Sequence, residues 1–396
     1  MPSLALYVHF PFCLSICPYC DFDRQATGFH RVDTYVECVI RELERYAGLD
    51  RQVHSIFFGG GTPSLMRPDH VSAVLATARK TFDVVPDAEI TLECNPGDAD
   101  LEKLQAFRAT GANRLSFGIQ SLDDAFLTLL GRRHSSAEAR QAAAWASQAG
   151  FAFNLDFMFG LPDQTLAHWQ MTLDQAVALA PDHLSCYLLT VDEKVPMGRD
   201  VARGKLVLPV DDDLAEMYTT TRERLALAGY EQYEISNWAR PGQASRHNLT
   251  YWRDGEWLGV GAGAASSYGG RRWKNTPLLE RYITSIEAGE AAACVEDEVP
   301  DRATAMLDFL TLGLRLREGV SRAAFETRFG LSLDEAVGEP GAWLRAQGFL
   351  QQDGDRVRIA AEHQLITNEI LVRLDESLLE VAQARRETSA SQTAAR

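Results

Sequence analysis

The residues best suited to chemistry are three closely spaced cysteines near the N-terminus: Cys13, Cys17 and Cys20. A structural zinc site would need a fourth ligand, yet position 22 is Phe22 and the next cysteine, Cys38, falls in a helical segment. Three thiolates on one short loop can instead hold three irons of a 4Fe-4S cluster, which leaves the fourth iron open to another ligand. Zinc and buried core cysteines are the alternatives, and Pro11 and Pro18 argue against a regular core element here. The spacing therefore predicts an iron–sulfur site.

Composition narrows the class of protein. Seven cysteines among 396 residues are too few, and odd in number, for a disulfide framework, which favours a reducing compartment. The formal net charge is −16, so the chain lacks the basic excess that phosphate-backbone binding requires. Residues 1–20 carry no charged side chain, but prolines interrupt any helix and no basic residue precedes the apolar part. We therefore expect a cytoplasmic protein with neither a membrane anchor nor a nucleic-acid partner.

Alternating strands and helices must position the cysteines. The predicted strands are Leu4–His9, Ser55–Phe58, Ile90–Glu93, Arg114–Ile119, Phe153–Phe157 and His183–Leu189. The predicted helices between and after them are Thr34–Tyr46, Pro68–Thr81, Asp100–Thr110, Leu122–Leu130, Ala137–Gln148 and Leu166–Leu179. Such alternation indicates βαβ units around a parallel sheet, either doubly wound or arranged as a barrel-like (β/α) array.

Polar or glycine-rich residues follow the strands in turn. After the cysteines come Gly59–Thr62, Glu93–Pro96, Gln120, Asp156 within the fifth strand, and Tyr187–Thr190. Because parallel-sheet folds place their ligands at the carboxyl ends of the strands, we expect these residues to share one site.

The C-terminal part differs in composition and pattern. A junction is predicted near residues 287–300, which divides the chain into a domain of residues 1–290, a domain of residues 301–380 and a disordered tail of residues 383–396. The second domain should contain helices at Ala303–Arg317 and Arg322–Phe329, a helix beginning at Trp343–Gln347, and a last helix at Ile366–Leu379. A hairpin of Phe349–Gln352 and Arg356–Ile359 should turn at Asp353-Gly354, so the domain resembles a winged helix.

Cys-x3-Cys-x2-Cys is the signature of the radical S-adenosylmethionine (SAM) enzymes, and the chain resembles that family. Tyr7–Cys13 and Cys17–Phe22 resemble the branch that contains the oxygen-independent coproporphyrinogen III dehydrogenases and the HemW-type heme chaperones. The resemblance continues in order through Gly59–Pro63, Glu93 with Asn95-Pro96, Arg114–Ser121, Leu130–His134, Asp156 with Gly160–Pro162, and His183–Ser185.

The resemblance implies a fold, two cofactors and a set of site residues. The fold would be a partial (β/α)6-type radical SAM barrel with a C-terminal α+β winged-helix-like domain. Cys13, Cys17 and Cys20 would hold a 4Fe-4S cluster whose open iron binds SAM. The residues that would contact SAM are Tyr7, Tyr19, Gly60, Gly61, Thr62, Glu93, Gln120, Arg132 and Asp156, with Arg133 as the neighbouring alternative to Arg132. Outside the resemblance, the alternatives are a tight turn for the glycines, a solvated or capping role for Glu93, a capping role for Asp156 and core packing for the two tyrosines.

Two features of the sequence distinguish the dehydrogenases of this branch from its chaperones. The dehydrogenases usually carry a fourth cysteine where this chain has Phe22. Residues 247–252 match the HNxxYW motif of the chaperones, in which His247 would ligate heme iron while Tyr251 and Trp252 offer stacking surface. A core histidine beside packed aromatic rings is the alternative interpretation of the motif.

The sequence departs from the family pattern at Ala265, where the family usually has a histidine. This departure leaves the roles of the residues on the substrate side of the site unassigned. The resemblance favours a chaperone whose partners are heme, an acceptor hemoprotein such as a membrane respiratory enzyme, and an electron donor for the cluster. Coproporphyrinogen III decarboxylation is the alternative activity. A winged-helix module that binds nucleic acid is a further alternative, which the acidic charge disfavours. Whether SAM is cleaved or only bound stays open, and so do the catalytic residues.

Overall fold

The computed structural model describes residues 3–98, 100–375 and 378, and these form two compact units. As far as its residues are described, the first unit comprises Met1–Glu231, Ser236–His247 and Glu256–Asp297. The second comprises Gln232–Ile235, Asn248–Gly255 and the described residues from Glu298 onward. Among the described residues, no helix is both long enough and apolar enough to cross a membrane.

Six parallel strands form the centre of the first unit: β1 (Ser3–Phe10), β2 (Gln52–Gly60), β3 (Asp83–Cys94), β4 (Arg114–Gln120), β5 (Ala152–Phe159) and β6 (His183–Leu188). Each strand pairs in parallel with the next one in sequence, and all six predicted strands are confirmed. Further strands extend both edges, in the order β12-β11-β10-β9-β1 on one side and β6-β8-β7 on the other. The six central strands therefore form an open sheet rather than a closed barrel.

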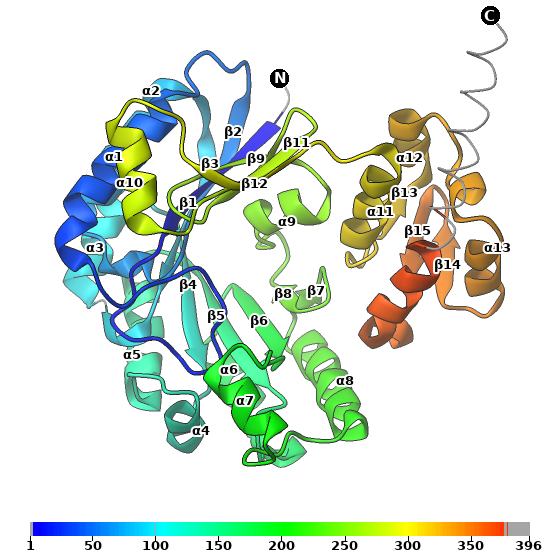
Figure 1. Ribbon diagram of the computed structural model, residues 1–396. Helices are drawn as coiled ribbons and strands as arrows, with labels where there is room; N and C mark the ends of the chain where they lie inside the picture. The colour runs from blue at the N-terminus through cyan, green and yellow to red at the C-terminus, as the bar shows by residue number, and fades with distance from the viewer. Residues whose placement is uncertain (1–2, 99, 376–377, 379–396) are drawn as a thin grey trace, which may run out of the picture. The chain divides into compact units, whose positions relative to one another are not determined.

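The added strands are short. They are β7 (Glu231–Gln232), β8 (Asn237–Ala239), β9 (Glu256–Val260), β10 (Ala265–Tyr268), β11 (Arg271–Asn275) and β12 (Cys294–Glu298). β9 runs parallel to β1, while β8 is antiparallel to β6 (Figure 1). The sequence pattern of strand and helix did not reveal these strands, because most are too short to show an alternation of apolar residues.

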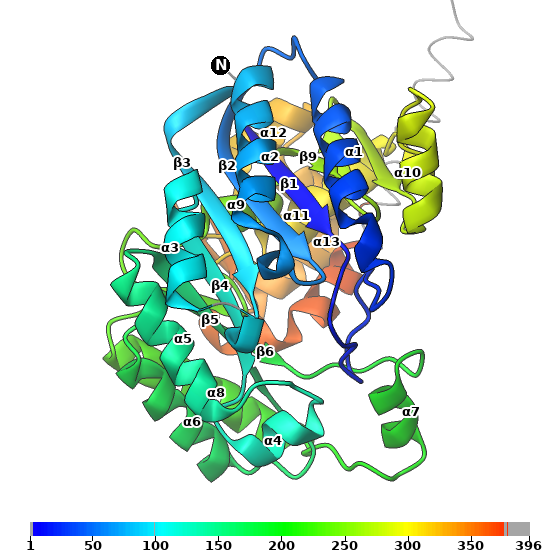
Figure 2. The same ribbon diagram turned by 90° about the vertical axis from the view of Figure 1, so that its left-hand side faces the viewer.

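Each crossover between the parallel strands contains a helix. The predicted helices are confirmed as α1 (Val32–Glu44), α2 (Pro68–Thr81), α3 (Leu101–Thr110), α4 (Asp124–Leu129), α5 (Ser136–Gln148) and α6 (Leu166–Ala178). Figure 2 shows α1, α2, α3 and α5 in front of the sheet, on one of its faces. Local chemistry fixes their ends: a capping box of Ser135 and Glu138 begins α5, and Gly111, with φ of 107°, ends α3.

The remaining helices of the chain's larger part are α7 (Pro196–Ala202), α8 (Asp211–Leu227), α9 (Arg246–Trp252) and α10 (Leu279–Glu287). Short 3-10 helices lie at η1 (Phe29–Arg31), η2 (Pro63–Leu65) and η3 (Pro96–Asp98). Both η2 and η3 directly follow strands of the parallel sheet, at the edge where the site is expected.

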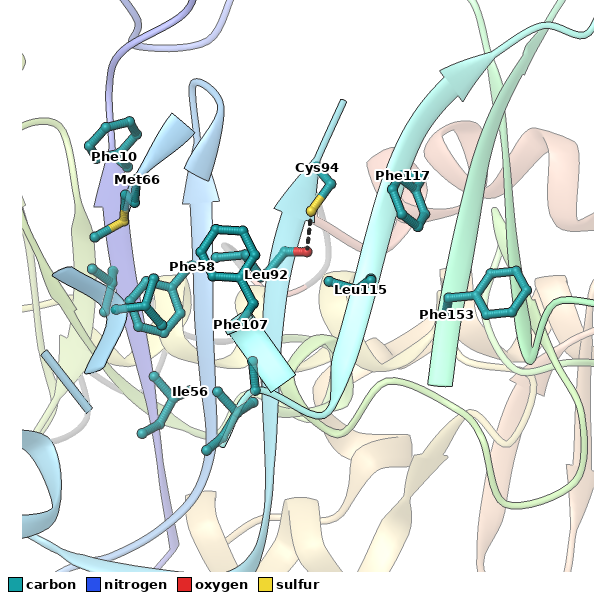
Figure 3. Close-up of a cluster of buried hydrophobic side chains, with 14 of the residues drawn as sticks. Phe10, Ile56, Phe58, Met66, Leu92, Cys94, Phe107, Leu115, Phe117 and Phe153 are labelled. Carbon is teal, nitrogen blue, oxygen red and sulfur yellow. Dashed lines mark hydrogen bonds between the residues drawn. The ribbon is translucent and has the colours of Figure 1, made fainter. Parts of the chain in front are cut away.

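Side-chain alternation divides each parallel strand between the core and the opposite face of the sheet. Figure 3 shows Phe58, Leu92, Leu115 and other buried side chains of neighbouring strands packed together. Because successive side chains of a strand point to opposite faces, the residues between these core positions face the other way. That second face carries Glu93, Ser116 and other polar side chains.

The second unit contains α11 (Arg302–Gly313), β13 (Val320–Ser321), α12 (Arg322–Phe329), α13 (Leu333–Ala346), β14 (Leu350–Asp353), β15 (Arg356–Ile359) and η4 (Ala361–Ile366). Its sheet has the order β13-β15-β14 with antiparallel pairing, which is the expected winged-helix-like order of helices and hairpin. The last helix is described over residues 367–375. The predicted end of that helix and the predicted disordered tail of residues 383–396 lie outside the described residues.

Several predicted boundaries in this unit were wrong. α11 ends at Gly313 rather than Arg317, because Leu316 forms a bridge with Glu234. α13 begins at Leu333, where Ser332 provides a capping box, and is interrupted by a kink at Gly338 (φ 50°), so the predicted start at Trp343 falls within its second part, after Pro340. The hairpin turns at residues 354–355, because Asp353 already pairs with Arg356.

The predicted first domain of residues 1–290 also needs correction. Two short segments within it, Gln232–Ile235 and Asn248–Gly255, belong to the second unit. Arg253 forms an ion pair with Glu318 at 3.1 Å, and the Arg315 guanidinium lies over the Trp252 ring. These contacts join residues about 65 positions apart in sequence, which composition cannot reveal.

Candidate functional site

A cavity of about 490 Å³ lies at the carboxyl ends of the parallel strands, where such sheets bind their ligands. Its walls come from the loop after β1, residues 11–25 (the cysteine loop), from the ends of β2 to β6, and from residues 131–134. This volume suits a small organic ligand. The predicted site residues that line it are Cys13, Cys17, Tyr19, Cys20, Gly60, Gly61, Thr62, Glu93, Gln120, Arg132 and Asp156.

Backbone hydrogen bonds close the cysteine loop at its base. The Cys13 N–H donates to the Gln25 carbonyl at 2.9 Å, and the Gln25 N–H donates to the Pro11 carbonyl at 2.7 Å. Farther along the loop, the Arg24 guanidinium donates to the Phe22 carbonyl at 2.8 Å and also to the Cys20 carbonyl. The loop therefore holds its three thiols at one cavity.

The three thiols fit a cluster site by their chemistry. All three are half-buried and none forms a disulfide. Burial raises the pKa of the Cys13 and Cys20 thiols, while the Thr62 hydroxyl, 3.5 Å from Cys13 Sγ, opposes that rise for Cys13. Because metals bind the thiolate, cluster assembly would release these protons and supply the charge that the hydroxyl is placed to stabilise.

Two glycines of the loop after β2 allow the backbone to approach the cysteine loop. Gly60 has a φ of +111°, and a Cβ on it would lie 2.6 Å from the His9 ring. A Cβ on Gly61 would lie 2.7 Å from the Phe12 carbonyl oxygen. Since only glycine fits such positions, this cradle keeps the backbone exposed to a ligand in the cavity.

Gly61→Ala is expected to destabilise the protein by about 1–3 kcal/mol, because the group that must move is backbone of the cysteine loop. The same movement should weaken SAM binding. Thermal unfolding and calorimetric titration with SAM measure both effects. Gly97→Ala is the control, since its Cβ would meet His134 at an ordinary 3.7 Å. Equal unfolding midpoints for the two variants would contradict the cradle.

Two carboxyl groups face the cavity from neighbouring parts of the sheet. Burial and, secondarily, the nearby Asp156 raise the pKa of Glu93 to about 8, against a hydrogen bond from the Gly60 N–H at 3.1 Å. Burial also raises the pKa of Asp156, against hydrogen bonds from Asn154 at 2.7 Å and Ser116 at 3.3 Å. Such a pair suits a ligand that brings an ammonium group and hydroxyl donors.

Arg132 reaches from the loop after α4 to the cysteines. Its guanidinium lies 3.5 Å from Cys17 Sγ and 3.4 Å from the Tyr19 hydroxyl. Its Nε is buried and lacks a hydrogen-bond partner among the described residues, so one donor is left for a ligand carboxylate. The alternative, Arg133, forms an ion pair with Asp98 at 3.1 Å.

Gln120 ends β4 with an unusual backbone conformation. Its φ is +70°, and the pairing of β4 with β5 shifts register between Gly118 and Gln120. Backbone strain of this kind in a non-glycine residue is concentrated at functional sites. Here the bulge accompanies a side chain that lines the cavity.

Tyr7 does not line the cavity, in contrast to the other predicted SAM-contacting residues. Its hydroxyl forms a hydrogen bond with His9 Nδ1 at 3.1 Å, and its ring stacks on Phe57 with centroids 6.2 Å apart. Because Tyr7 precedes the end of β1 at Phe10 by three residues, its ring lies below the edge where the cavity opens.

The HNxxYW motif divides between the two units. His247 belongs to the first unit, is 1% exposed, and has its Nδ1 3.0 Å from the Ser55 hydroxyl. Burial lowers the pKa of His247 to about 3, and its ring stacks on Phe57. Tyr251 and Trp252 are half-buried residues of the second unit.

The sequence placed Asn95 at the site, within Glu93–Pro96, but gave it no individual role. It assigned no role to several other residues that line the cavity: Leu14, Ile16, Asp98, Ser116, Gly118 and Met158. The alternation of β4 was the available signal, since Ser116 and Gly118 share the face of Gln120. Ala265, which replaces the family's usual histidine, is exposed at the start of β10 and does not line the cavity.

Comparison with known proteins agrees with this geometry. Residues 7–176 match the radical SAM superfamily, and residues 301–362 match the HemN C-terminal domain. The structure of coproporphyrinogen III oxidase (HemN) from Escherichia coli superposes with a TM-score of 0.81 at 24% identity, covering 94% of this chain and 90% of that one. The fold and the cysteine-lined cavity thus define a radical SAM protein, a class that implies a 4Fe-4S cluster and SAM.

Closer relatives identify the branch. The chain is 37% identical to the heme chaperone HemW of Escherichia coli over 94% of its length and 98% of the relative's. It is 38% identical to the heme chaperone HemW of Synechocystis, with 82% and 80% covered. A mouse relative, radical S-adenosyl methionine domain-containing protein 1, mitochondrial, is 37% identical, with 96% and 89% covered. The chain belongs to the HemW family of radical SAM proteins.

Proposed function

We propose that this protein is a heme chaperone, which binds heme and delivers it to acceptor hemoproteins on a radical SAM scaffold. The observation that carries the proposal is the 37% identity to the Escherichia coli heme chaperone HemW along nearly the whole of both chains. Phe22 supports it, because the related dehydrogenases usually have a fourth cysteine there. The reducing compartment that the free cysteines favour is the cytoplasm.

In the proposed site, Cys13, Cys17 and Cys20 hold the cluster. When bound, the cluster supplies an electron that can cleave SAM, and an electron donor must then reduce the cluster. The Nε donor of Arg132 suits the SAM carboxylate, and Glu93 suits its amino group. The acceptor oxygens of Asp156 suit the ribose hydroxyls. Tyr19, Gly60, Gly61, Thr62 and Gln120 complete the enclosure.

For heme itself, the proposed contacts are those of the HNxxYW motif. His247 is a neutral imidazole at physiological pH, which is the form that ligates iron. Its bond with Ser55 orients the ring through Nδ1, as partners of metal-binding histidines do. Since the imidazole is 1% exposed, ligation requires the segment around it to open. Tyr251 and Trp252 would then offer stacking surface.

His247→Ala is expected to weaken hemin binding at least about tenfold while the cluster stays intact, since an axial ligand is lost. Absorbance titration with hemin measures the affinity, and iron and sulfide analysis measures the cluster. His30→Ala, at an exposed histidine of η1, is the control. Equal hemin affinity in both variants would make His247 a core histidine only.

The alternative is oxidative decarboxylation of coproporphyrinogen III. Phe22 lines the cavity and is 64% exposed, so a polar fourth cysteine is replaced by an apolar ring at the mouth. Anaerobic turnover with SAM, a strong reductant and coproporphyrinogen III, followed by chromatography, decides between the two. We expect no decarboxylation beside an active dehydrogenase. Formation of protoporphyrinogen would favour the alternative.

The second unit argues against the nucleic-acid-binding alternative. In α12, the Arg328 guanidinium forms an ion pair with Asp254 at 2.7 Å, and Arg322 pairs with Asp334. Both basic side chains of this helix are therefore neutralised within the unit, where a winged helix needs them for phosphate contacts.

A further inference from the structure

Asn95, the residue after β3, has its side-chain amide fixed by three neighbours. The Arg132 guanidinium donates to Asn95 Oδ1 at 2.6 Å, and a guanidinium can only donate. Asn95 Nδ2 lies 3.2 Å from Asp98 Oδ2, and a carboxylate can only accept. These two partners leave one orientation for the amide, with its oxygen toward Arg132 and its nitrogen toward Asp98 and Thr62.

This orientation determines what the Thr62 hydroxyl does. Asn95 Nδ2 donates to Thr62 Oγ1 at 3.1 Å, so that oxygen acts as the acceptor and its own proton is free to point elsewhere. The hydroxyl lies 3.5 Å from Cys13 Sγ and donates to it. Thr62 is 4% exposed, so little water competes for this proton. The amide thus directs a hydrogen bond onto the first thiol.

The opposite end of the amide directs a second donor onto another thiol. Asn95 Oδ1 and the Gly118 carbonyl, at 2.5 Å, both accept from one terminal nitrogen of Arg132. The other terminal nitrogen then lies 3.5 Å from Cys17 Sγ. Anchored by these carbonyls, the guanidinium presents a positively charged donor to the sulfur.

The Asp98 carboxylate, which accepts from the Asn95 amide, is itself held in place. The Asp98 side chain is 3% exposed and also accepts from Arg133 at 3.1 Å. Its carboxylate therefore has little freedom to turn away from Asn95. A continuous chain runs from Cys13 Sγ through Thr62, Asn95 and Arg132 to Cys17 Sγ.

We propose that Asn95 is a positioning residue that sets the hydrogen bonds on two thiolates of the cluster, through Thr62 and Arg132, and thereby raises its reduction potential. Hydrogen bonds to cluster sulfurs tune the potential, because they stabilise the more negative, reduced state. The inference rests on ligation of the cluster by the three cysteines, which belongs to the proposed function. Heme delivery has no part in it.

The test is an EPR-monitored redox titration of the anaerobically reconstituted full chain without SAM. Asn95→Leu keeps the branched shape of the side chain but removes its amide oxygen and nitrogen, and Thr62→Val removes the hydroxyl alone. We expect a shift to more negative potential in both variants, larger in Asn95→Leu, at unchanged iron content. Thr77→Val, at a threonine of α2 that does not line the cavity and whose hydroxyl donates to the Ala73 carbonyl at 3.0 Å, is the matched control and should titrate like the wild type.

An Asn95→Leu potential that equals the Thr77→Val potential would overturn the inference. Should Asn95→Leu take up no iron, Asn95→Ser removes the same bridge with less bulk and is judged by the same comparison. Iron and sulfide analysis of the wild type distinguishes the failure of cluster ligation from the failure of this inference. A wild type without a cluster refutes the ligation by the three cysteines. An intact cluster whose potential is unchanged in the Asn95 variants refutes only the role of Asn95.

Discussion

Cys17→Ser is expected to abolish the 4Fe-4S centre. The serine hydroxyl is a hard, protonated ligand that does not replace a thiolate on iron. The loss should be severe, because the cysteine loop supplies all the thiols that line the cavity apart from Cys94, whose side chain points into the core in Figure 3. Anaerobic iron and sulfide analysis should fall from about four of each per chain to well below that number.

The control for this variant is Cys294→Ser. Cys294 is exposed at the start of β12 and does not line the cavity, so the cluster content should match that of the wild type. An unchanged stoichiometry in Cys17→Ser would contradict the assignment of the cysteine loop as the cluster site.

Glu93→Gln is expected to stabilise the SAM-free protein increasingly as the pH rises. The folded-state pKa of Glu93, about 8, lies above its ordinary value of 4.5 because the carboxyl is desolvated beside Asp156. A carboxyl with a raised pKa contributes stability that is present below about pH 4.5 and is lost as the pH rises through about 8. The glutamine carries no charge, so the variant avoids a loss of unfolding free energy on the order of a few kcal/mol.

The same substitution should weaken SAM binding, because the carboxylate that would pair with the ligand's ammonium group is gone. Wild-type affinity for SAM should rise as Glu93 ionises, whereas the variant's affinity should show no such rise. Unfolding midpoints and SAM titrations between about pH 6 and pH 9 test both statements around the shifted pKa. Parallel pH profiles for wild type and variant would contradict the assignment.

Much of the fold can be predicted from the sequence, because the residue patterns typical of strands and of helices are both strong in it. The apolar runs of the six parallel strands and the helical segments between them marked the βαβ units closely. The structure shows that Asp100, Ser135 and Thr165 cap three of these helices. The polar residues after those strands converge at one cavity as expected, since parallel strands end at the same edge.

Other features could not be predicted from the sequence. They depend on how far a side chain lies from the cavity along its strand and on contacts between residues distant in the chain. Tyr7 shares the face of His9 on β1, yet no residue of that strand lines the cavity, whose lining begins at Cys13 in the loop after it. His247 matches a motif, but its burial against Ser55 and Phe57 depends on β2, nearly two hundred residues earlier. The orientation of the Asn95 amide depends on Arg132, which the sequence places in a different loop.

Heme transfer tests the central claim most directly. Hemin is titrated into the anaerobically reconstituted protein, excess is removed, and the complex is mixed with an apo form of a b-type hemoprotein while absorbance is recorded. The account predicts saturable, stoichiometric hemin binding followed by the appearance of the acceptor's holo spectrum. Failure to bind hemin saturably, or retention of bound hemin in the presence of the acceptor, would contradict it.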